Sequence, residues 1–469
     1  MELMKRVLIR TLPVLIFTIM SCSKDMNVSS ADIVTLIDNE LYVSRADTVI
    51  KSADAVKVAN LFSFNGTDAT KVNFSKSVKS VNEFKDSESE LGVYVVNYEG
   101  GGWVLVSSTK KHYPILAYSD KGIFCTDTLN GVSQYLNSYK REINRKHKLP
   151  VSDVKSEMEA WKVYEEKNMP GYYMTKDSDP LTGLIGRSMS QWSNEGYDVY
   201  PITEDEIEGI PNNVLTDFKL IAETSSNYNY DYQISCFILK GYYSVISGSQ
   251  SYLLQTAWGQ QNGYNQYLVE EMGGNPYIGC GAVAIGQIMK YHSNYPLDQN
   301  RYKWGNMSNV ASTEYTAQLL YDINRAIRLN DVNYNATSIE KIANYLNTIC
   351  YSYDNLYNNN SNSIFNSIYN NRPVYMQGGL YNSLQGHAWV CDGAYRVQNF
   401  KVYRLMILSY DEPLSFVQAG EYGPLLLSSD YYFHMNWGEY GVNNGWYTSG
   451  QSMQGFDYGR MNIYDICPM

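Results

Sequence analysis

Short runs of hydrophobic residues, separated by glycines and polar residues, mark the region between residues 93 and 118. Residues 93–96 and 103–106 are apolar runs on either side of the glycines at 100–102, a spacing typical of a β-hairpin with a glycine loop. Residues 115–118 form a third run of the same kind. The pattern therefore predicts at least three neighbouring strands.

Helical patterns flank these strands. A helical stretch is predicted around residues 53–64, and apolar positions recur at helical spacing from Val132 to Ile143 before a basic segment. Together these elements predict a compact α+β domain over residues 41–150.

A second pattern begins after residue 249. Apolar positions from 284 to 291 follow helical spacing, and Pro276 and Gly279 mark the entry to this helix. Residues 386–393 and 433–438 instead alternate with the period of two that is typical of strands. Residues 249–469 are therefore predicted to combine a helical part with an antiparallel sheet.

The segment between the two domains has a weaker pattern. Residues 204–208 are acidic and helix-like, whereas residues 232–243 are rich in Tyr and Asn and resemble a strand. We interpret residues 151–248 as a linker or inserted region.

The first residues read as a targeting segment. Lys5 and Arg6 precede an apolar stretch, residues 7–20, that is too short to span a membrane and is typical of a signal peptide. The small residue Ser21 followed by Cys22 resembles a bacterial lipobox, in which the cysteine becomes lipidated. The alternative is an ordinary secretory peptide with an incidental cysteine.

These features predict a lipoprotein signal peptide over residues 1–21 and a polar tether over residues 22–40. The protein is then extracytoplasmic and lipid-anchored to a bacterial membrane, in the periplasm or at the cell surface, and release after processing is compatible with this expectation. No other segment is long and apolar enough to cross a bilayer, so membrane attachment is expected through the lipid anchor only.

The composition argues against several classes of function. The net charge of −11 and the lack of a basic stripe argue against nucleic-acid binding. The 44 Tyr against 13 Phe favour a strand-rich fold with a polar surface. None of the seven Cys forms a C-x-x-C pair, so neither a zinc site nor a redox motif is indicated, and we expect no cofactor and no metal.

Cys280 is the candidate nucleophile. Its place at a predicted helix N-terminus favours the thiolate, although a free cysteine is more often a small buried apolar residue. His387 and Asn436 lie on predicted neighbouring strands, where they can face each other as a base and its orienting partner. We prefer His387 as the base over two other histidines, His434 and His292.

Three motifs then show a family resemblance. They are G-C-x-A-x-x-x-x-Q-I-M-K-Y-H at residues 279–292, G-H-A-x-V-x-D-G at 386–393 and H-x-N-W-G at 434–438. With them the chain resembles the streptopain family of papain-like cysteine peptidases. The resemblance implies a papain-like peptidase domain preceded by a small α+β inhibitory prosegment, residues 41–150.

The resemblance also implies roles for single residues. Cys280 attacks the scissile carbonyl, and His387 takes its proton and later protonates the leaving amine. Asn436 holds the imidazole in its working tautomer, and Trp437 shields that hydrogen bond from water. Gln260, the polar residue of W-x-Q, donates its amide to the oxyanion together with the backbone N–H of Cys280. Cys391, on the same strand face as His387, is interpreted as a packing residue.

The implied function is that of a secreted cysteine endopeptidase made as a zymogen. Its partners are protein or peptide substrates and its own prosegment, with removal by an activating protease as one route to the mature enzyme. Two alternatives stay open: an inactive surface binding or inhibitor protein on the same fold, and acyl transfer by the same thiol. Glu439 and Tyr440 replace the family's second W-G, and a carboxylate there is expected to favour basic substrate side chains.

Overall fold

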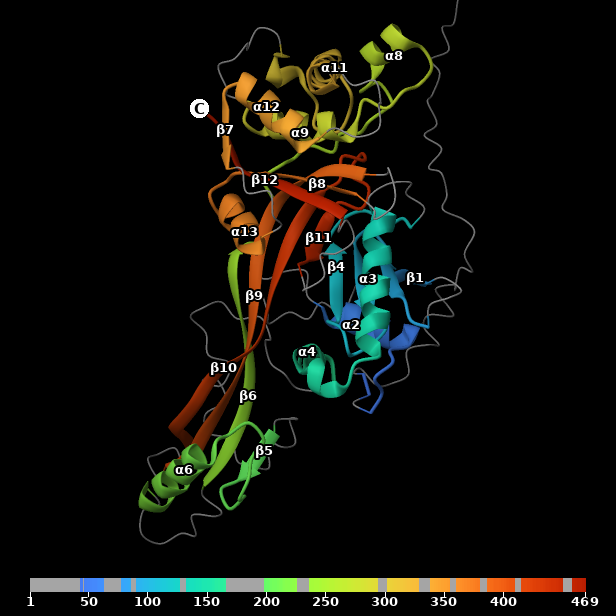
Figure 1. Ribbon diagram of the computed structural model, residues 1–469. Coiled ribbons are helices and arrows are strands. Elements are labelled where there is room, and N and C mark those ends of the chain that lie inside the picture. The colour runs from blue at the N-terminus through green and yellow to red at the C-terminus, as the bar shows by residue number, and fades with distance from the viewer. Residues whose placement is uncertain are drawn as a thin grey trace, which may run out of the picture.

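A computed structural model describes most of the chain after residue 42. The described residues are 43–44, 46–62, 77–85, 90–126, 132–165, 198–225, 236–293, 302–328, 338–354, 360–379, 386–409, 415–449 and 458–469. They form an N-terminal unit, a C-terminal unit and an elongated arm (Figure 1). The signal peptide, the tether and Cys22 lie outside the described residues.

The N-terminal unit comprises residues 43–165 and packs helices on both faces of an antiparallel sheet. Its elements are α2 (Ser52–Leu61), β1 (Val78–Phe84), β2 (Val93–Tyr98), β3 (Trp103–Ser107), β4 (Ile115–Ser119), α3 (Val132–His147), the 3-10 turn η1 (Val151–Asp153) and α4 (Lys155–Glu165). The predicted glycine loop joins β2 to β3, with positive φ at Gly100, Gly101 and Gly102. The predicted helices and strands of residues 53–143 are therefore present.

This unit continues beyond residue 150. Helix α4 packs Trp161 fully inside the unit, where its indole N–H donates to the His112 carbonyl at 2.7 Å. The first part of the predicted linker thus belongs to the N-terminal unit.

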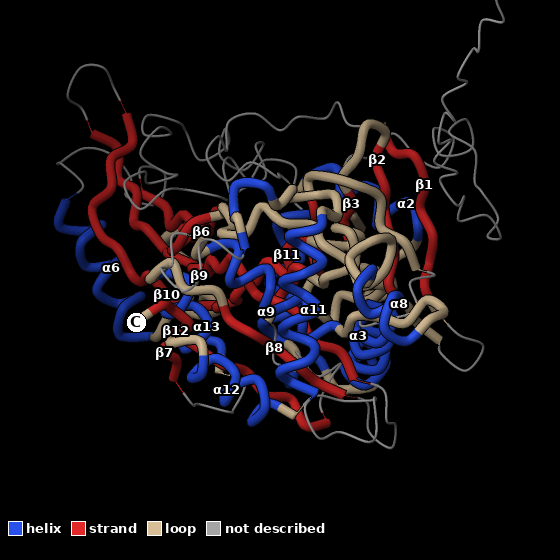
Figure 2. The backbone as a smooth tube through the Cα atoms, turned by 90° about the horizontal axis from the view of Figure 1, so that it is seen from above, coloured by secondary structure: helices blue, strands red, loops and turns tan. Residues whose placement is uncertain are grey.

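The C-terminal unit has a helical side and a sheet side. Its helical elements are α8 (Gln266–Met272), α9 (Cys280–Tyr291), η3 (Trp304–Asn306), α11 (Glu314–Arg328), α12 (Ile339–Thr348) and α13 (Ser361–Tyr369). Its strands are β7 (Tyr351–Asp354), β8 (Val374–Gly379), β9 (Gly386–Ser409), β10 (Ser415–Asn436), β11 (Gly445–Thr448) and β12 (Tyr458–Pro468). Helices α9 and α11 lie side by side above the sheet (Figures 1 and 2) and bury Ala282, Ile285 and Leu320 between them. This is the predicted α+β architecture.

One continuous sheet joins the two units. The strand order is β1-β2-β3-β4-β11-β10-β9-β8-β12-β7, and the junction is the antiparallel pair of β4 with β11. There Tyr118 pairs with Trp446 and Ala117 with Tyr447. The N-terminal unit thus binds the C-terminal unit by extending its sheet.

Both faces of this junction are buried. On one face Trp103 of β3 shares a hydrophobic cluster with Trp389 and Trp437 of the C-terminal unit. On the other face Tyr118 packs with Trp446 in a second cluster. Because burying apolar area contributes roughly 25 cal/mol per Å², docking of the two units is driven mainly by these shared clusters.

The arm carries most of the predicted linker. Strand β5 (Asp198–Pro201), helix α6 (Asn212–Ser225) and strand β6 (Cys236–Ser249) pack on the far halves of β9 and β10. Phe218, Ile238 and Leu405 lie in its separate core. Where it is described, the linker is therefore folded. The strand expected over residues 232–243 overlaps β6, whereas residues 204–208, expected to be helix-like, form turns and irregular backbone. The pairing of β6 with residues 394–407, far along the chain, has no local sequence signal.

Within the described part of the chain, no helix has the length and apolarity needed to cross a bilayer.

Candidate active site

Cys280 is the first residue of α9, as predicted. Gly279 precedes it with φ 96°, a left-handed conformation that glycine adopts without strain and that turns the chain into the helix. Burial raises the pKa of the Cys280 thiol, and the backbone N–H groups of Ala388 and Gly281 offset this only in part. In this structure the helix N-terminus therefore does not by itself produce the expected thiolate.

His387 lies at the start of β9 and is 5% exposed. Its Nε2 is 2.9 Å from the Trp437 carbonyl oxygen, which can only accept a hydrogen bond, so Nε2 carries the proton. Nδ1 is then the ring atom with a lone pair for proton transfer. Burial lowers the pKa of His387, while the carboxylate of Glu439 and the Trp437 carbonyl act in the opposite direction.

Asn436 does not take the position that was expected from strand alternation. The register pairs it with Val390, so its side chain points to the α9 face of the sheet. There its amide N–H donates to the Thr256 carbonyl at 2.7 Å, and its oxygen accepts from Gln287 of α9 at 3.2 Å. His387 lies three residues before Val390 and is therefore not the cross-strand neighbour of Asn436. The prediction that both side chains face each other is therefore wrong.

Among the described residues, the group that orients the His387 imidazole is the backbone carbonyl of Trp437, which accepts a hydrogen bond from Nε2. The Trp437 ring is fully buried and stacks on His387 with 6.4 Å between ring centroids. Trp437 donates from its backbone N–H to the Asn444 side chain at 3.0 Å, and from its indole N–H to the Asn443 carbonyl at 3.1 Å and the Tyr447 hydroxyl at 3.3 Å. A backbone carbonyl has no sequence signature, so this partner could not have been found from residue types.

Gln260 lies close to the nucleophile's helix. Its carbonyl accepts from the backbone N–H of Ile278 at 3.0 Å, and the residue is 7% exposed. Its side-chain Nε2 donates to Glu439 Oε1 at 2.7 Å. The carboxylate that we expected to bind basic substrate side chains thus has a partner inside the protein.

The competing candidates lie elsewhere. His434 Nδ1 is 2.6 Å from Asp392 Oδ1, and its ring stacks on Tyr252 at a centroid distance of 4.1 Å. His292 directly follows α9, and burial lowers its pKa to about 4. Cys391 is fully buried, in agreement with a packing role.

Among the described residues, no group of three or more His, Cys, Asp or Glu side chains is arranged to hold a metal ion. The chemistry of the site rests on a thiol, an imidazole and amide donors.

A half-buried thiol at a helix N-terminus, an oriented imidazole on the adjoining sheet and a docked N-terminal unit define a thiol peptidase in a precursor form. Residues 258–447 match the peptidase C10 family, and residues 47–143 match the Spi protease inhibitor. The C-terminal unit therefore carries a peptidase domain of the C10, or streptopain, type, and an inhibitor-like N-terminal unit precedes it.

Two solved structures are similar to the chain. A fragment of prointerpain A from Prevotella intermedia shares 16% identity at a TM-score of 0.43, with 83% of this chain and 99% of that chain covered. Active interpain A cysteine protease from the same organism shares 20% identity at a TM-score of 0.31, with 45% and 92% covered. No curated protein matches the chain.

Proposed function

We propose that this protein is a secreted endopeptidase zymogen in which Cys280 is the nucleophile and His387 the general base. The observation that carries the proposal is the hydrogen bond from His387 Nε2 to the Trp437 carbonyl, because it leaves Nδ1 free for proton exchange with the Cys280 thiol.

The catalytic cycle follows from these groups. The Cys280 sulfur, after giving its proton to His387, forms a bond to the scissile carbonyl carbon. The C–N bond then breaks as His387 protonates the leaving amine, and water hydrolyses the resulting thioester. Gln260 and the backbone N–H of Cys280 stabilise the oxyanion.

The docked N-terminal unit accounts for latency. Burial favours the neutral thiol of Cys280 and the neutral imidazole of His387, a pair with little nucleophilic thiolate. Trp437, which orients the imidazole, lies in the same buried cluster as Trp103 of the N-terminal unit. Removal of that unit therefore changes the environment of the active pair.

Replacement of the nucleophile tests the function. The variant Cys280→Ala should lose hydrolysis of denatured protein and labelling by a thiol-directed epoxide. Cys350→Ser, which removes a thiol at the end of α12, should keep both. Activity in Cys280→Ala equal to that of the wild type would disprove the assignment. Incorporation of an added amine without hydrolysis would instead indicate acyl transfer.

The location of the protein is a second part of the proposal. The lipobox-like Ser21-Cys22 supports a mature protein held to a bacterial membrane, in the periplasm or at the cell surface, by acyl chains on Cys22. Cells fed a labelled fatty acid should label the wild-type chain but not Cys22→Ser. Mass spectrometry of the mature N-terminus that finds an unmodified Cys22 would contradict the anchor.

A further inference from the structure

The turn that follows β10 has an unusual backbone conformation. Positive φ angles recur along it, at Gly438 (70°), Tyr440 (57°), Gly441 (78°) and Asn443 (58°). Two of these residues are not glycine, and left-handed backbone there is uncommon and costs free energy unless surrounding contacts hold it. The turn is therefore held in place by its contacts.

Those contacts are made with the loop that carries Gln260. The backbone N–H of Tyr440 donates to the Trp258 carbonyl at 3.0 Å, and the N–H of Gln261 donates to the Tyr440 hydroxyl at 2.8 Å. A Cβ atom on Gly259 would come within 2.1 Å of the Tyr440 ring. Glycine at 259 thus permits the Tyr440 ring to lie directly on the loop backbone.

This packing brings Glu439 to the side chain of Gln260. Glu439 Oε1 accepts from Gln260 Nε2 at 2.7 Å. An ionised carboxylate only accepts hydrogen bonds, so it selects the orientation of the Gln260 amide in which the nitrogen, not the oxygen, faces it. A primary amide has two N–H bonds, and once one is held by Glu439, the direction of the other is fixed.

We propose that Glu439 is the positioning residue of the oxyanion donor: it holds the Gln260 amide in the orientation that directs the second N–H to the substrate's oxyanion. The proposal rests on the proposed function, in which Gln260 stabilises that oxyanion. Without Glu439, the amide can rotate and present its carbonyl oxygen, which would repel the developing charge.

The charge of Glu439 also affects the pKa values of Cys280 and His387. Its carboxylate raises the pKa of Cys280 and that of His387, in each case as a smaller influence than burial. The Tyr440 phenol also interacts with Glu439, and burial raises the pKa of Tyr440, which keeps this phenol neutral near pH 7. Removing the charge of Glu439 should therefore shift the pH–rate profile of the enzyme.

The test compares full-length variants that are trimmed by affinity-tagged wild-type enzyme, which is then removed. Gln260→Ala should lower kcat about 100- to 1000-fold. Glu439→Ala should lower kcat roughly 10- to 100-fold, because a misplaced catalytic group costs this much, with a small change in KM. Glu439→Gln, which keeps an acceptor oxygen, should recover part of the loss. Glu270→Ala, at an exposed carboxylate of α8, serves as the charge-matched control.

Two further readouts separate positioning from loss of structure. The double variant Gln260→Ala/Glu439→Ala should match Gln260→Ala within about twofold, because both changes act through one group. Both limbs of the pH–rate profile should move to lower pH in Glu439→Gln, since the carboxylate raises both pKa values.

The outcomes distinguish this proposal from the proposed function. Wild-type kcat in Glu439→Ala, or losses that multiply in the double variant, would overturn the positioning role even if Cys280→Ala is inactive. Wild-type kcat in Gln260→Ala would overturn it as well. An active Cys280→Ala variant would instead disprove the proposed function itself.

Discussion

The Asn443 side chain pairs with both backbone groups of Cys125, across the boundary between the two units. Its oxygen accepts from the Cys125 N–H at 2.9 Å, and its N–H donates to the Cys125 carbonyl, also at 2.9 Å. Asn443 belongs to the turn whose backbone also supports Trp437. The inhibitory N-terminal unit is thus hydrogen-bonded to the turn that supports Trp437, the hydrogen-bond partner of the His387 imidazole.

We expect loss of this contact to weaken latency. The variant Asn443→Gly tolerates the local φ of 58° and removes the side chain, leaving two Cys125 backbone groups without these bonds. An unsatisfied buried group costs about 1–3 kcal/mol, so the full-length chain should become active faster. Asn371→Gly, at an exposed left-handed position (φ 58°), is the matched control. Equal activation rates of both variants, measured with a fluorogenic peptide, would refute the role of this contact.

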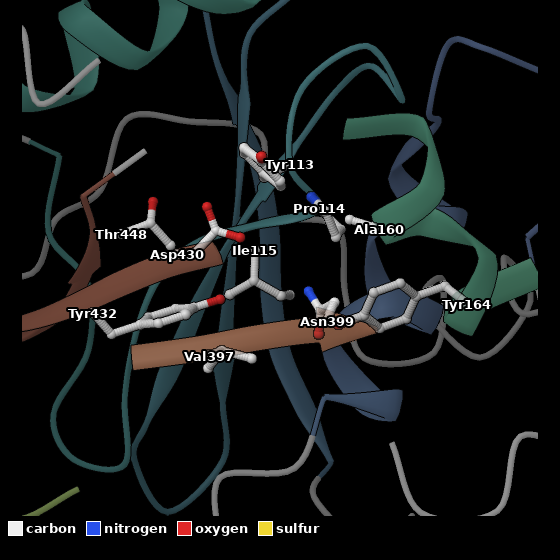
Figure 3. A pocket seen from close by; sticks show the side chains of 10 residues that line it. All are labelled: Tyr113, Pro114, Ile115, Ala160, Tyr164, Val397, Asn399, Asp430, Tyr432 and Thr448. Carbon is white, nitrogen blue, oxygen red and sulfur yellow. The ribbon is translucent and has the colours of Figure 1, made fainter. Parts of the chain in front are cut away.

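A second prediction concerns a small cavity of about 40 Å³ between the two units (Figure 3). Tyr113 and Tyr164 of the N-terminal unit line it together with Asp430 and Tyr432 of β10. Burial raises the pKa of Asp430 from 3.8 to about 7. Because residues of the N-terminal unit contribute to this burial, docking is coupled to protonation of Asp430.

The sign of this coupling follows from the raised pKa. Below pH 3.8 the Asp430 carboxyl is protonated in both the docked and the undocked form, so docking is strongest there. Between pH 3.8 and about 7 only the docked form keeps this proton, so docking weakens as the pH rises, and above about 7 it weakens no further. Glu157 raises the pKa of Asp430 further, whereas Lys146 and a hydrogen bond from Ser428 lower it. His112 acts in the opposite direction, since burial lowers its pKa from 6.5 to about 4 and disfavours the folded unit in acid.

The variant Asp430→Asn isolates the contribution of the carboxyl group. His112 is common to both proteins, so the difference in latency between wild type and variant should be small near pH 4 and grow to a plateau above pH 7, with the variant more latent. Asp354→Asn, at an exposed position in β7, controls for the loss of one charge. A difference between wild type and Asp430→Asn that does not vary with pH would contradict the prediction.

Local signals in the sequence were sufficient for some elements. Pro276 and Gly279 predicted the start of the helix that begins at Cys280, and the glycines at 100–102 predicted the β2–β3 hairpin. Each depends on backbone preferences of residues close in sequence. The arm was predictable only in part: the strand-like pattern of residues 232–243 overlaps β6, but its partner strand β9 lies far along the chain.

The same distinction applies to the site. Cys280 and His387 are proposed as the reacting pair from their residue types and motifs, and that assignment stays a prediction. The partner of His387 is a backbone carbonyl, and the partner of Gln260 is Glu439, which is far away in sequence. The departure of Glu439 from the family pattern was visible in the sequence, but its contact with Gln260 depends on the fold.

A third prediction distinguishes two roles for Asn436. Its hydrogen bonds join β10 to Thr256 and to Gln287 of α9, so Asn436→Ala should cost about 1–3 kcal/mol of stability. Loss of a group that sets the tautomer of a catalytic histidine costs about 10⁴-fold in kcat. We expect a lower melting temperature and less than about 100-fold loss of kcat, because the Trp437 carbonyl still orients His387. A 10⁴-fold loss at unchanged stability would restore Asn436 as the orienting residue.

The last prediction concerns the reactivity of Cys280 before and after processing. Burial raises the pKa of Cys280 and lowers that of His387, so the intact chain favours thiol and imidazole, without charge separation. Only the thiolate is alkylated, and below the pKa its fraction rises tenfold per pH unit. Iodoacetamide should therefore react slowly with the intact chain near pH 6, and at a rate that increases steeply with pH.

Removal of the N-terminal unit should raise the alkylation rate near pH 6 and flatten its pH dependence, because an imidazolium at His387 can then stabilise the thiolate. The variant His387→Ala supplies the internal control. It should leave alkylation of the intact chain almost unchanged, where the imidazole is neutral, but slow that of the processed enzyme. If His387→Ala slows both forms equally, the ion pair exists before processing, and latency must come from blocked substrate access rather than from the protonation of the catalytic pair.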